Sequence, residues 1–190
     1  MLIRPATSDD APQIRALFRI ILKQMELKKL RNLNQQRLNL ALELSFKTKE
    51  CRLSKGQIIV AEVDGEVAGM AFGYPSQADS DIDELLCHYF PKVGLPAYES
   101  LYDNDDSQLT KTEWYLDSLA VKPKFRGLGI ATALLKRLPK IAARCGKTKV
   151  SLDVDLTNPK AKKLYRKLGF KQTDTLQIGS HRYHHLMRAI

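Results

Sequence analysis

The sequence contains few cysteines and no long apolar segment. Cys51, Cys87 and Cys145 are widely spaced, and no two of them form a Cys-x-x-Cys pair. The odd count argues against a disulfide framework and against a zinc site, and it predicts reduced thiols. No stretch approaches the roughly 20 apolar residues that cross a bilayer, and the N-terminal residues lack the apolar run of a signal peptide. We therefore expect a cytoplasmic protein that is not associated with a membrane.

The chain also lacks internal repeats and low-complexity segments. Its 190 residues suffice for one domain, and 44% hydrophobic with 27% charged residues is the composition of a globular protein with a core. The formal net charge of +10 favours partners that carry phosphate groups, such as nucleotides, nucleic acid or anionic membranes. The composition therefore restricts the class of partner but not the fold.

Turn and cap signals divide the chain into helices and strands. Asp64-Gly65 is a strong signal for a two-residue hairpin, Ser8-Asp9-Asp10 can cap a helix, and Pro139 predicts a kink or break in its helix. Strands are expected at 2–5, 57–63, 66–73, 113–121, 149–154, 170–175 and 182–187, and helices after Asp10 and at 34–46, 129–144 and 158–168. This order predicts an α/β fold with a mixed sheet in one domain, residues 1–190.

The segment Arg126–Ala131 follows a strand and opens an amphipathic helix. Free N–H groups at a helix start attract anions, Gly127 and Gly129 let a phosphate approach the backbone, and Arg126 adds a positive charge. These features favour a diphosphate ligand, although the same glycines also fit a tight turn with positive φ. Thr132 stands where a dinucleotide fingerprint needs glycine or alanine, and no Gly-Lys-Ser/Thr of a Walker A loop is present.

Three motifs in this region resemble the GNAT superfamily of N-acetyltransferases. Arg126-x-x-Gly129-x-Ala131 is similar to the pyrophosphate loop of that family, Leu119–Pro123 to the strand end before it, and Asn158–Phe170 to its second cofactor motif. The resemblance covers residues 114–173 closely, the N-terminal part only by the order of its elements, and residues 76–111 not at all. It implies a GNAT fold, with helices on both faces of the sheet. It also implies an enzyme that moves the acetyl group of acetyl-CoA, without a metal, to a primary amine on a small molecule, protein or peptide.

The resemblance implies a role for each residue of these motifs. Backbone groups of the strand end pair with the pantetheine arm of the cofactor, N–H groups of the loop hold its pyrophosphate, and Asn158 hydrogen-bonds the arm. Tyr165 protonates the departing thiolate. The implied cofactor-binding residues are Leu119, Ala120, Val121, Arg126, Gly127, Leu128, Gly129, Ile130, Ala131 and Asn158. From the residues alone, Tyr165 could also be a core residue, and Asn158 is also a good N-cap.

The amine acceptor must lose a proton before it attacks, because an amine with a pKa of about 10 is charged at neutral pH. Asp117 is the candidate general base, since it lies in the strand beside the cofactor, and Glu113 is the second choice. A structural hydrogen bond at a strand end is the alternative for Asp117. His181, His184 and His185 resemble a metal cluster only loosely, and we interpret them as strand-surface residues.

Charge is distributed unevenly along the chain. Residues 122–171 contain fifteen lysines and arginines against two aspartates, whereas residues 76–111 contain eight acids and two lysines. The acidic segment is too short for its own core, so we interpret it as an insertion in the domain. We expect the basic part to serve the anionic cofactor. Our hypothesis for the acidic part, including Asp103, Asp105 and Asp106, is that it borders the acceptor cleft and attracts a cationic acceptor; the alternative is a solvated loop.

Two other functions compete with acetyl transfer. A binding module could keep the fold and sense acyl-CoA without turnover. The charge of +10 also suits a nucleic-acid-binding protein, but the basic residues follow the cofactor motifs and no aromatic-interleaved basic patch is present. We therefore expect no nucleic-acid partner. The sequence leaves the oligomeric state open, and a homodimer is one option.

Overall fold

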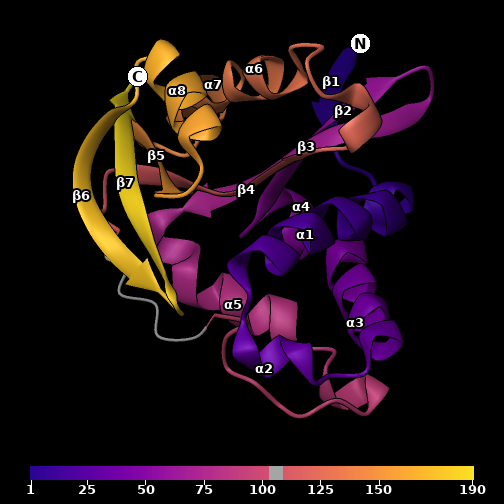
Figure 1. Ribbon diagram of the computed structural model, residues 1–190. Helices are drawn as coiled ribbons and strands as arrows, with labels where there is room; N and C mark the ends of the chain where they lie inside the picture. The colour runs from indigo at the N-terminus through magenta and orange to yellow at the C-terminus, as the bar shows by residue number, and fades with distance from the viewer. Residues whose placement is uncertain (103–108) are drawn as a thin grey trace.

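The computed structural model describes residues 1–102 and 109–190, and these residues form one mixed sheet covered by helices on both faces (Figure 1). The strand order is β1-β2-β3-β4-β5-β7-β6. The strands are β1 (Leu2–Pro5), β2 (Gln57–Val63), β3 (Glu66–Pro75), β4 (Glu113–Val121), β5 (Lys149–Asp155), β6 (Lys171–Ile178) and β7 (His181–Ala189). The helices are α1 (Ala11–Met25), α2 (Lys28–Arg31), α3 (Gln35–Lys47), α4 (Lys49–Leu53), α5 (Asp79–Cys87), α6 (Ile130–Leu135), α7 (Leu138–Arg144) and α8 (Pro159–Lys167). The expected α/β fold is thus confirmed.

Each face of the sheet has its own apolar core. On the lower face in Figure 1, α1, α3 and α5 pack buried side chains such as Phe18, Phe46 and Ile82 against β2, β3 and β4. On the upper face, α6, α7 and α8 cover a second core around Trp114 and Leu152. Since burial of apolar area is the main stabilising term in folding, the two cores fix the helices on their two faces.

The described residues of the segment 76–111 contribute apolar side chains to the core on the α1, α3 and α5 face of the sheet. Ile82 and Leu86 on α5 are 1% and 0% exposed, and Phe90 after the helix is fully buried. The segment also contains the helix α5. Asp103, Asp105 and Asp106 lie outside the described residues, so the hypothesis about these three side chains stays a prediction.

Most expected elements are present, and the differences have local causes. The helix expected at 129–144 is divided into α6 and α7, because Pro139 has no N–H to donate and its ring displaces the carbonyl four residues earlier. The helix α4 was not predicted from the sequence. Its start is capped by the Thr48 hydroxyl, which accepts a hydrogen bond from the N–H of Cys51 at 3.2 Å. Strands β6 and β7 extend further than expected, because they form one long hairpin.

The sheet opens between β4 and β5. These two strands pair in parallel from Glu113↔Lys149 to Leu116↔Leu152 and no further. Beyond that point β4 stays paired only with β3, and β5 only with β7. The edge of β4 that faces β5 therefore has no described strand partner along its last residues, so its backbone N–H and C=O groups can bind an extended ligand.

A β-bulge in β4 lies at this opening. The register passes from Gly73↔Leu116 to Phe72↔Ser118, so Asp117 has no partner residue on β3. Gly73 permits the close packing here, since a Cβ at this position would lie 2.3 Å from the Trp114 ring. A bulge increases local twist and redirects a side chain, so this one both bends β4 and presents Asp117.

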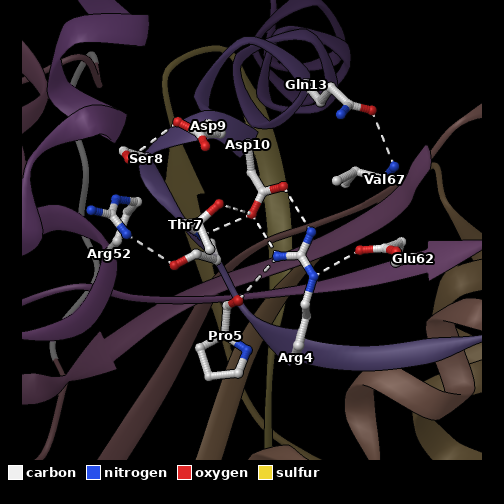
Figure 2. A network of polar contacts seen from close by, with 11 residues as sticks. Arg4, Pro5, Thr7, Ser8, Asp9, Asp10, Gln13, Arg52, Glu62 and Val67 are labelled. Carbon is white, nitrogen blue, oxygen red and sulfur yellow. Dashed lines mark hydrogen bonds and ion pairs between the residues drawn. The ribbon is translucent and has the colours of Figure 1, made fainter. Parts of the chain in front are cut away.

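An ion-pair network fixes the start of α1 against the sheet (Figure 2). Arg4 on β1 donates through its two terminal nitrogens to both oxygens of Asp10, at 2.6 and 2.9 Å, and its Nε donates to Glu62 on β2 at 2.8 Å. Asp10 also accepts from the backbone N–H of Thr7 at 2.7 Å. Burial opposes ionisation of Asp10, but the bonds from Arg4 and Thr7 outweigh it and hold its pKa below the usual value.

We predict that Asp10→Asn lowers the free energy of unfolding by about 1–3 kcal/mol, because it removes one partner of a mostly buried ion pair. Urea unfolding at pH 7 measures this loss. The folded-state pKa of Asp10 is lowered, so the wild-type contribution is present above the usual aspartate pKa and disappears as the pH falls through the folded value. Asp9→Asn is the control: Asp9 is exposed and should change stability by less than about 0.5 kcal/mol. Equal effects of both substitutions would contradict the prediction.

Candidate active site

A groove and a cavity occupy the opening between β4 and β5. The groove, about 340 Å³, is lined by Leu119, Ala120 and Val121 of β4, by Arg126 and Asn158, and by residues of α1. The cavity, about 370 Å³, is lined by Asp117, Leu119, Asn158 and Tyr165, among others. Because Leu119, Asn158 and two α1 residues line both spaces, the groove and the cavity are adjacent. The structure thus brings together seven of the residues selected from the sequence.

The loop 126–131 borders the groove through Arg126, whereas residues 127–131 are not part of the described groove lining. Gly127 and Gly129 have φ of 84° and 76°, a left-handed conformation that favours glycine. These two glycines therefore form a tight turn with positive φ, which was one of the two interpretations from the sequence. No side chain crowds either glycine, since a Cβ there would meet nothing within 4 Å. The backbone of this loop is therefore both shaped by glycine and accessible to a ligand.

Side chains of this loop differ in what they can contact. Leu128 is 64% exposed, whereas Ile130 is 2% exposed and packs in the second core. Ile130 can therefore contribute to a ligand site only through its backbone. Arg126 is exposed, and its Nε lies 3.4 Å from the carbonyl oxygen of Val121, so its guanidinium lies beside the end of β4.

Asn158 and Tyr165 both belong to α8. Asn158 is the N-cap of the helix, and its side-chain oxygen accepts from the N–H of Ala161 at 3.1 Å, as expected from its residue type. No hydrogen bond of its amide nitrogen is recorded among the described residues, so this group can donate to a ligand in the groove that Asn158 lines. The ring of Tyr165 is 8% exposed and packs against Phe170, yet the residue also lines the cavity. Burial raises the pKa of Tyr165 to about 12, so its hydroxyl group keeps its proton at neutral pH.

Asp117 lies on the cavity wall at the bulge. It accepts from the Tyr102 hydroxyl at 2.8 Å and from the Ser118 hydroxyl at 2.6 Å. Burial raises its pKa to about 7; the two hydrogen bonds oppose this shift, while the nearby charges of Asp83 and Asp79 add to it. A carboxylate with a pKa near the working pH can take up and release a proton readily, which is what a general base requires.

Similarity to known proteins agrees with this geometry. The sequence model of the acetyltransferase (GNAT) family matches residues 26–170. The chain belongs to the GNAT family of acetyltransferases. A crystal structure of an acetyltransferase shares 38% identity with this GNAT chain, with a TM-score of 0.86 and full coverage of both chains. An N-acetyltransferase from Staphylococcus aureus Mu50 shares 26% identity over 99% of this chain and 100% of its own, with a TM-score of 0.79.

More distant structures share the GNAT fold. The Salmonella typhimurium protein yncA, solved with its cofactor acetyl-CoA, has 19% identity, a TM-score of 0.63, and coverage of 100% of this chain and 93% of its own.

No described helix is long and apolar enough to cross a membrane. Within the described residues, no group of three or more His, Cys, Asp or Glu side chains is arranged to hold a metal ion.

The cavity of this acetyltransferase is acidic and aromatic, a feature that the sequence analysis found only in part. Its described lining contains no lysine, arginine or histidine. It contains five aspartates (Asp79, Asp83, Asp117, Asp153 and Asp155) and five tyrosines (Tyr74, Tyr102, Tyr115, Tyr165 and Tyr183). The residues come from six different elements and from the loop before β4, so no local motif marks them. The only sequence signal was the acidic bias of the segment that contains Asp79 and Asp83.

Two interpretations from the sequence need correction. His185 is only 7% exposed, so it is not a strand-surface residue. Its ring turns toward β5, where Nδ1 donates to Asp153 at 2.7 Å. Glu113, the second choice for the base, is buried on the far side of His185 and does not line the cavity. Burial opposes its ionisation, but hydrogen bonds from His185 and Thr110 lower its pKa to about 2, which makes it a poor proton acceptor.

We predict that Asp117→Asn increases stability relative to wild type more at pH 8 than at pH 5. The folded-state pKa of Asp117 is raised, so the wild-type protein loses stability as the pH rises from about 4 through about 7, whereas the asparagine variant does not. The gain should grow by about 2–3 kcal/mol between the two pH values. Thermal unfolding of both proteins at both pH values measures it.

Asp155→Asn is the matched control, because Asp155 lines the same cavity but hydrogen bonds from Thr157 and His181 hold its pKa below the usual value despite burial. It should lower stability by the same amount at pH 5 and pH 8. A pH-independent difference for Asp117→Asn would show that this carboxyl ionises normally.

Proposed function

We propose that this GNAT protein transfers the acetyl group of acetyl-CoA to a primary amine on a cationic acceptor. The observation that carries the proposal is the groove along the unpaired edge of β4, which leads directly into an acidic cavity. The residues present fit acetyl-CoA: free backbone groups suit its amide-bearing arm, and an open glycine loop with Arg126 suits its pyrophosphate.

Each part of the chain would hold a different part of the cofactor. Backbone groups of Leu119 and Val121 would pair with the arm, and the amide of Asn158 would donate to it. The N–H groups of residues 127–131, with the guanidinium of Arg126, would hold the pyrophosphate. Bound acetyl-CoA supplies a thioester whose carbonyl carbon accepts the amine.

Asp117 and Tyr165 have complementary proton states. Asp117, with a pKa of about 7, would take the proton that the ammonium group of the acceptor must lose. Tyr165 stays protonated because burial raises its pKa to about 12, and it would donate its proton to the departing thiolate. Two groups whose environments drive their pKa values apart form a natural base and acid pair.

The cavity lining supports a cationic acceptor. Five carboxyl groups and five tyrosines surround it, although the whole chain carries a net charge of +10. Carboxylates and aromatic faces both attract ammonium groups. A polyamine, an amino-sugar or a protein amino terminus has the required charge. Location in the cytoplasm and a homodimeric state stay predictions.

We predict that Arg126→Ala weakens acetyl-CoA binding about tenfold, because it removes a charge-assisted contact to phosphate. Calorimetric titration of both proteins with acetyl-CoA and with CoA measures the change. Lys124→Ala removes the same charge two residues away, where the side chain pairs with Glu66 instead of lining the groove, and should stay within about twofold of wild type. No binding to wild type would overturn the proposed function.

We predict that kcat/KM for an amine acceptor rises with pH through about 7, as Asp117 loses its proton. Asp117→Asn should remove this rise and lower the rate about 100-fold, whereas Tyr165→Phe should keep the rise and lower kcat about 100-fold. Release of CoA with a panel of polyamines, amino-sugars and peptides measures these rates.

Tyr89→Phe serves as the control, since Tyr89 is a half-buried tyrosine outside the cavity lining. A Tyr165→Phe variant with the kcat of wild type would remove Tyr165 as the acid. Binding of acetyl-CoA without turnover of any amine in the panel would favour the acyl-CoA sensor.

A further inference from the structure

A buried chain of hydrogen bonds ends at the cavity wall. The Tyr115 hydroxyl donates to Asp153 Oδ2 at 2.9 Å, Asp153 Oδ1 lies 2.7 Å from His185 Nδ1, and His185 Nε2 lies 3.2 Å from Glu113 Oε2. The four residues come from β4, β5 and β7. Tyr115 and Asp153 line the cavity, whereas Glu113 and His185 lie behind them. We call this chain the relay.

The relay places three ionisable groups almost out of water. The side chains of Glu113, Asp153 and His185 are 1%, 3% and 9% exposed. Ion pairs this deeply buried add little stability, because the loss of solvation offsets the attraction. Replacing a buried ion pair by apolar side chains of similar volume often leaves stability unchanged or increases it. The relay therefore points to a role other than stability.

The direction of every proton in the relay follows from its charges. Burial alone would lower the pKa of His185, but the hydrogen bonds with Asp153 and Glu113 outweigh it and raise the pKa to about 9. At neutral pH the imidazolium thus donates to both carboxylates. Asp153 can then only accept, so the Tyr115 hydroxyl must turn its proton toward Asp153. Neither Tyr115 nor Asp153 therefore directs an acidic proton into the cavity, and the oxygens of both can accept from a cation there.

We propose that the relay binds and orients the reacting amine of the acceptor, with Tyr115 and Asp153 accepting two of its N–H groups. The inference rests on the proposed acetyl transfer. The amine arrives as an ammonium group with three N–H bonds; one proton passes to Asp117, which is two residues from Tyr115 on β4. The other two N–H bonds stay with Tyr115 and Asp153, so the nitrogen lone pair takes the direction of the lost proton, on the side of Asp117 and Leu119 where the groove joins the cavity. Glu113 and His185 are positioning residues.

A second histidine–aspartate pair on the same strands offers a comparison. His181 Nδ1 lies 2.8 Å from Asp155 Oδ2, but their side chains are 21% and 19% exposed. Asp155 Oδ1 is also held by the N–H and the hydroxyl of Thr157, each at 2.7 Å. Asp155 is therefore fixed without His181, whereas the side chain of Asp153 is held by His185 and Tyr115 alone among the contacts described here.

The test uses 1,4-diaminobutane as a probe, titrated by calorimetry into the full-length protein saturated with CoA. Wild type should bind the diamine. Tyr115→Phe removes a lone-pair acceptor, and Glu113→Gln removes the charge that holds His185, so each should weaken diamine binding about five- to tenfold. CoA affinity should stay within about twofold, because neither residue lines the groove. His181→Gln should leave both affinities unchanged.

A further readout separates positioning from a structural role. On any amine that is acetylated, Glu113→Gln should raise KM for the amine but not for acetyl-CoA. If Glu113→Gln does not fold, the double variant Glu113→Gln/His185→Gln keeps a neutral hydrogen-bonded pair and should show the same loss. Diamine affinity within twofold of wild type in the Tyr115 and Glu113 variants would overturn the relay, as would absence of diamine binding to the wild-type CoA complex. Absence of CoA binding itself would instead overturn the proposed function.

Discussion

The groove and the cavity exist because β4 and β5 stop pairing after Leu116 and Leu152. Continuous pairing would satisfy the backbone of β4 within the sheet, and there would be no free edge for a cofactor and no space for an acceptor. The bulge at Asp117 and the packing of Trp114 over Gly73 bend β4 at this point. The helices α1 and α8 then border the opening from the two faces, so α1, α8 and both strands contribute residues to its walls.

Electrostatics divides this opening into two chemically different parts. The groove carries Arg126 and Lys160, which suit an anionic cofactor. In the described lining of the cavity, by contrast, the only charged side chains are carboxylates. Within the cavity the carboxylates again differ. Burial raises the pKa of Asp117 to about 7, whereas Asp155 is held below the usual range by its hydrogen-bond donors despite burial. Similar residues on one wall thereby differ in how readily they exchange a proton at neutral pH.

Local signals in the sequence predicted what depends on neighbouring residues. The hairpin at Asp64-Gly65, the strand 113–121, the N-cap Asn158 and the helix break at Pro139 all follow from rules that act over a few positions. The family motifs also located five residues that line the groove, but not its three residues from α1. The relay could not be predicted, because Glu113, Asp153 and His185 meet only through strand pairing across 32 and 72 positions. Without the register, His185 looked like a surface residue.

The bulge has a consequence for how this scaffold can vary. Asp117 is an additional residue in β4 that no residue of β3 opposes. At regular strand positions a cross-strand neighbour restricts the size and shape of the side chain, and no residue of β3 imposes that restriction at position 117. Replacement there leaves the ladder on both sides in register. The group that faces the cavity at position 117 can thus change while the two cores and the free edge of β4 stay as they are, so the proton chemistry of the cavity wall can vary separately from the fold.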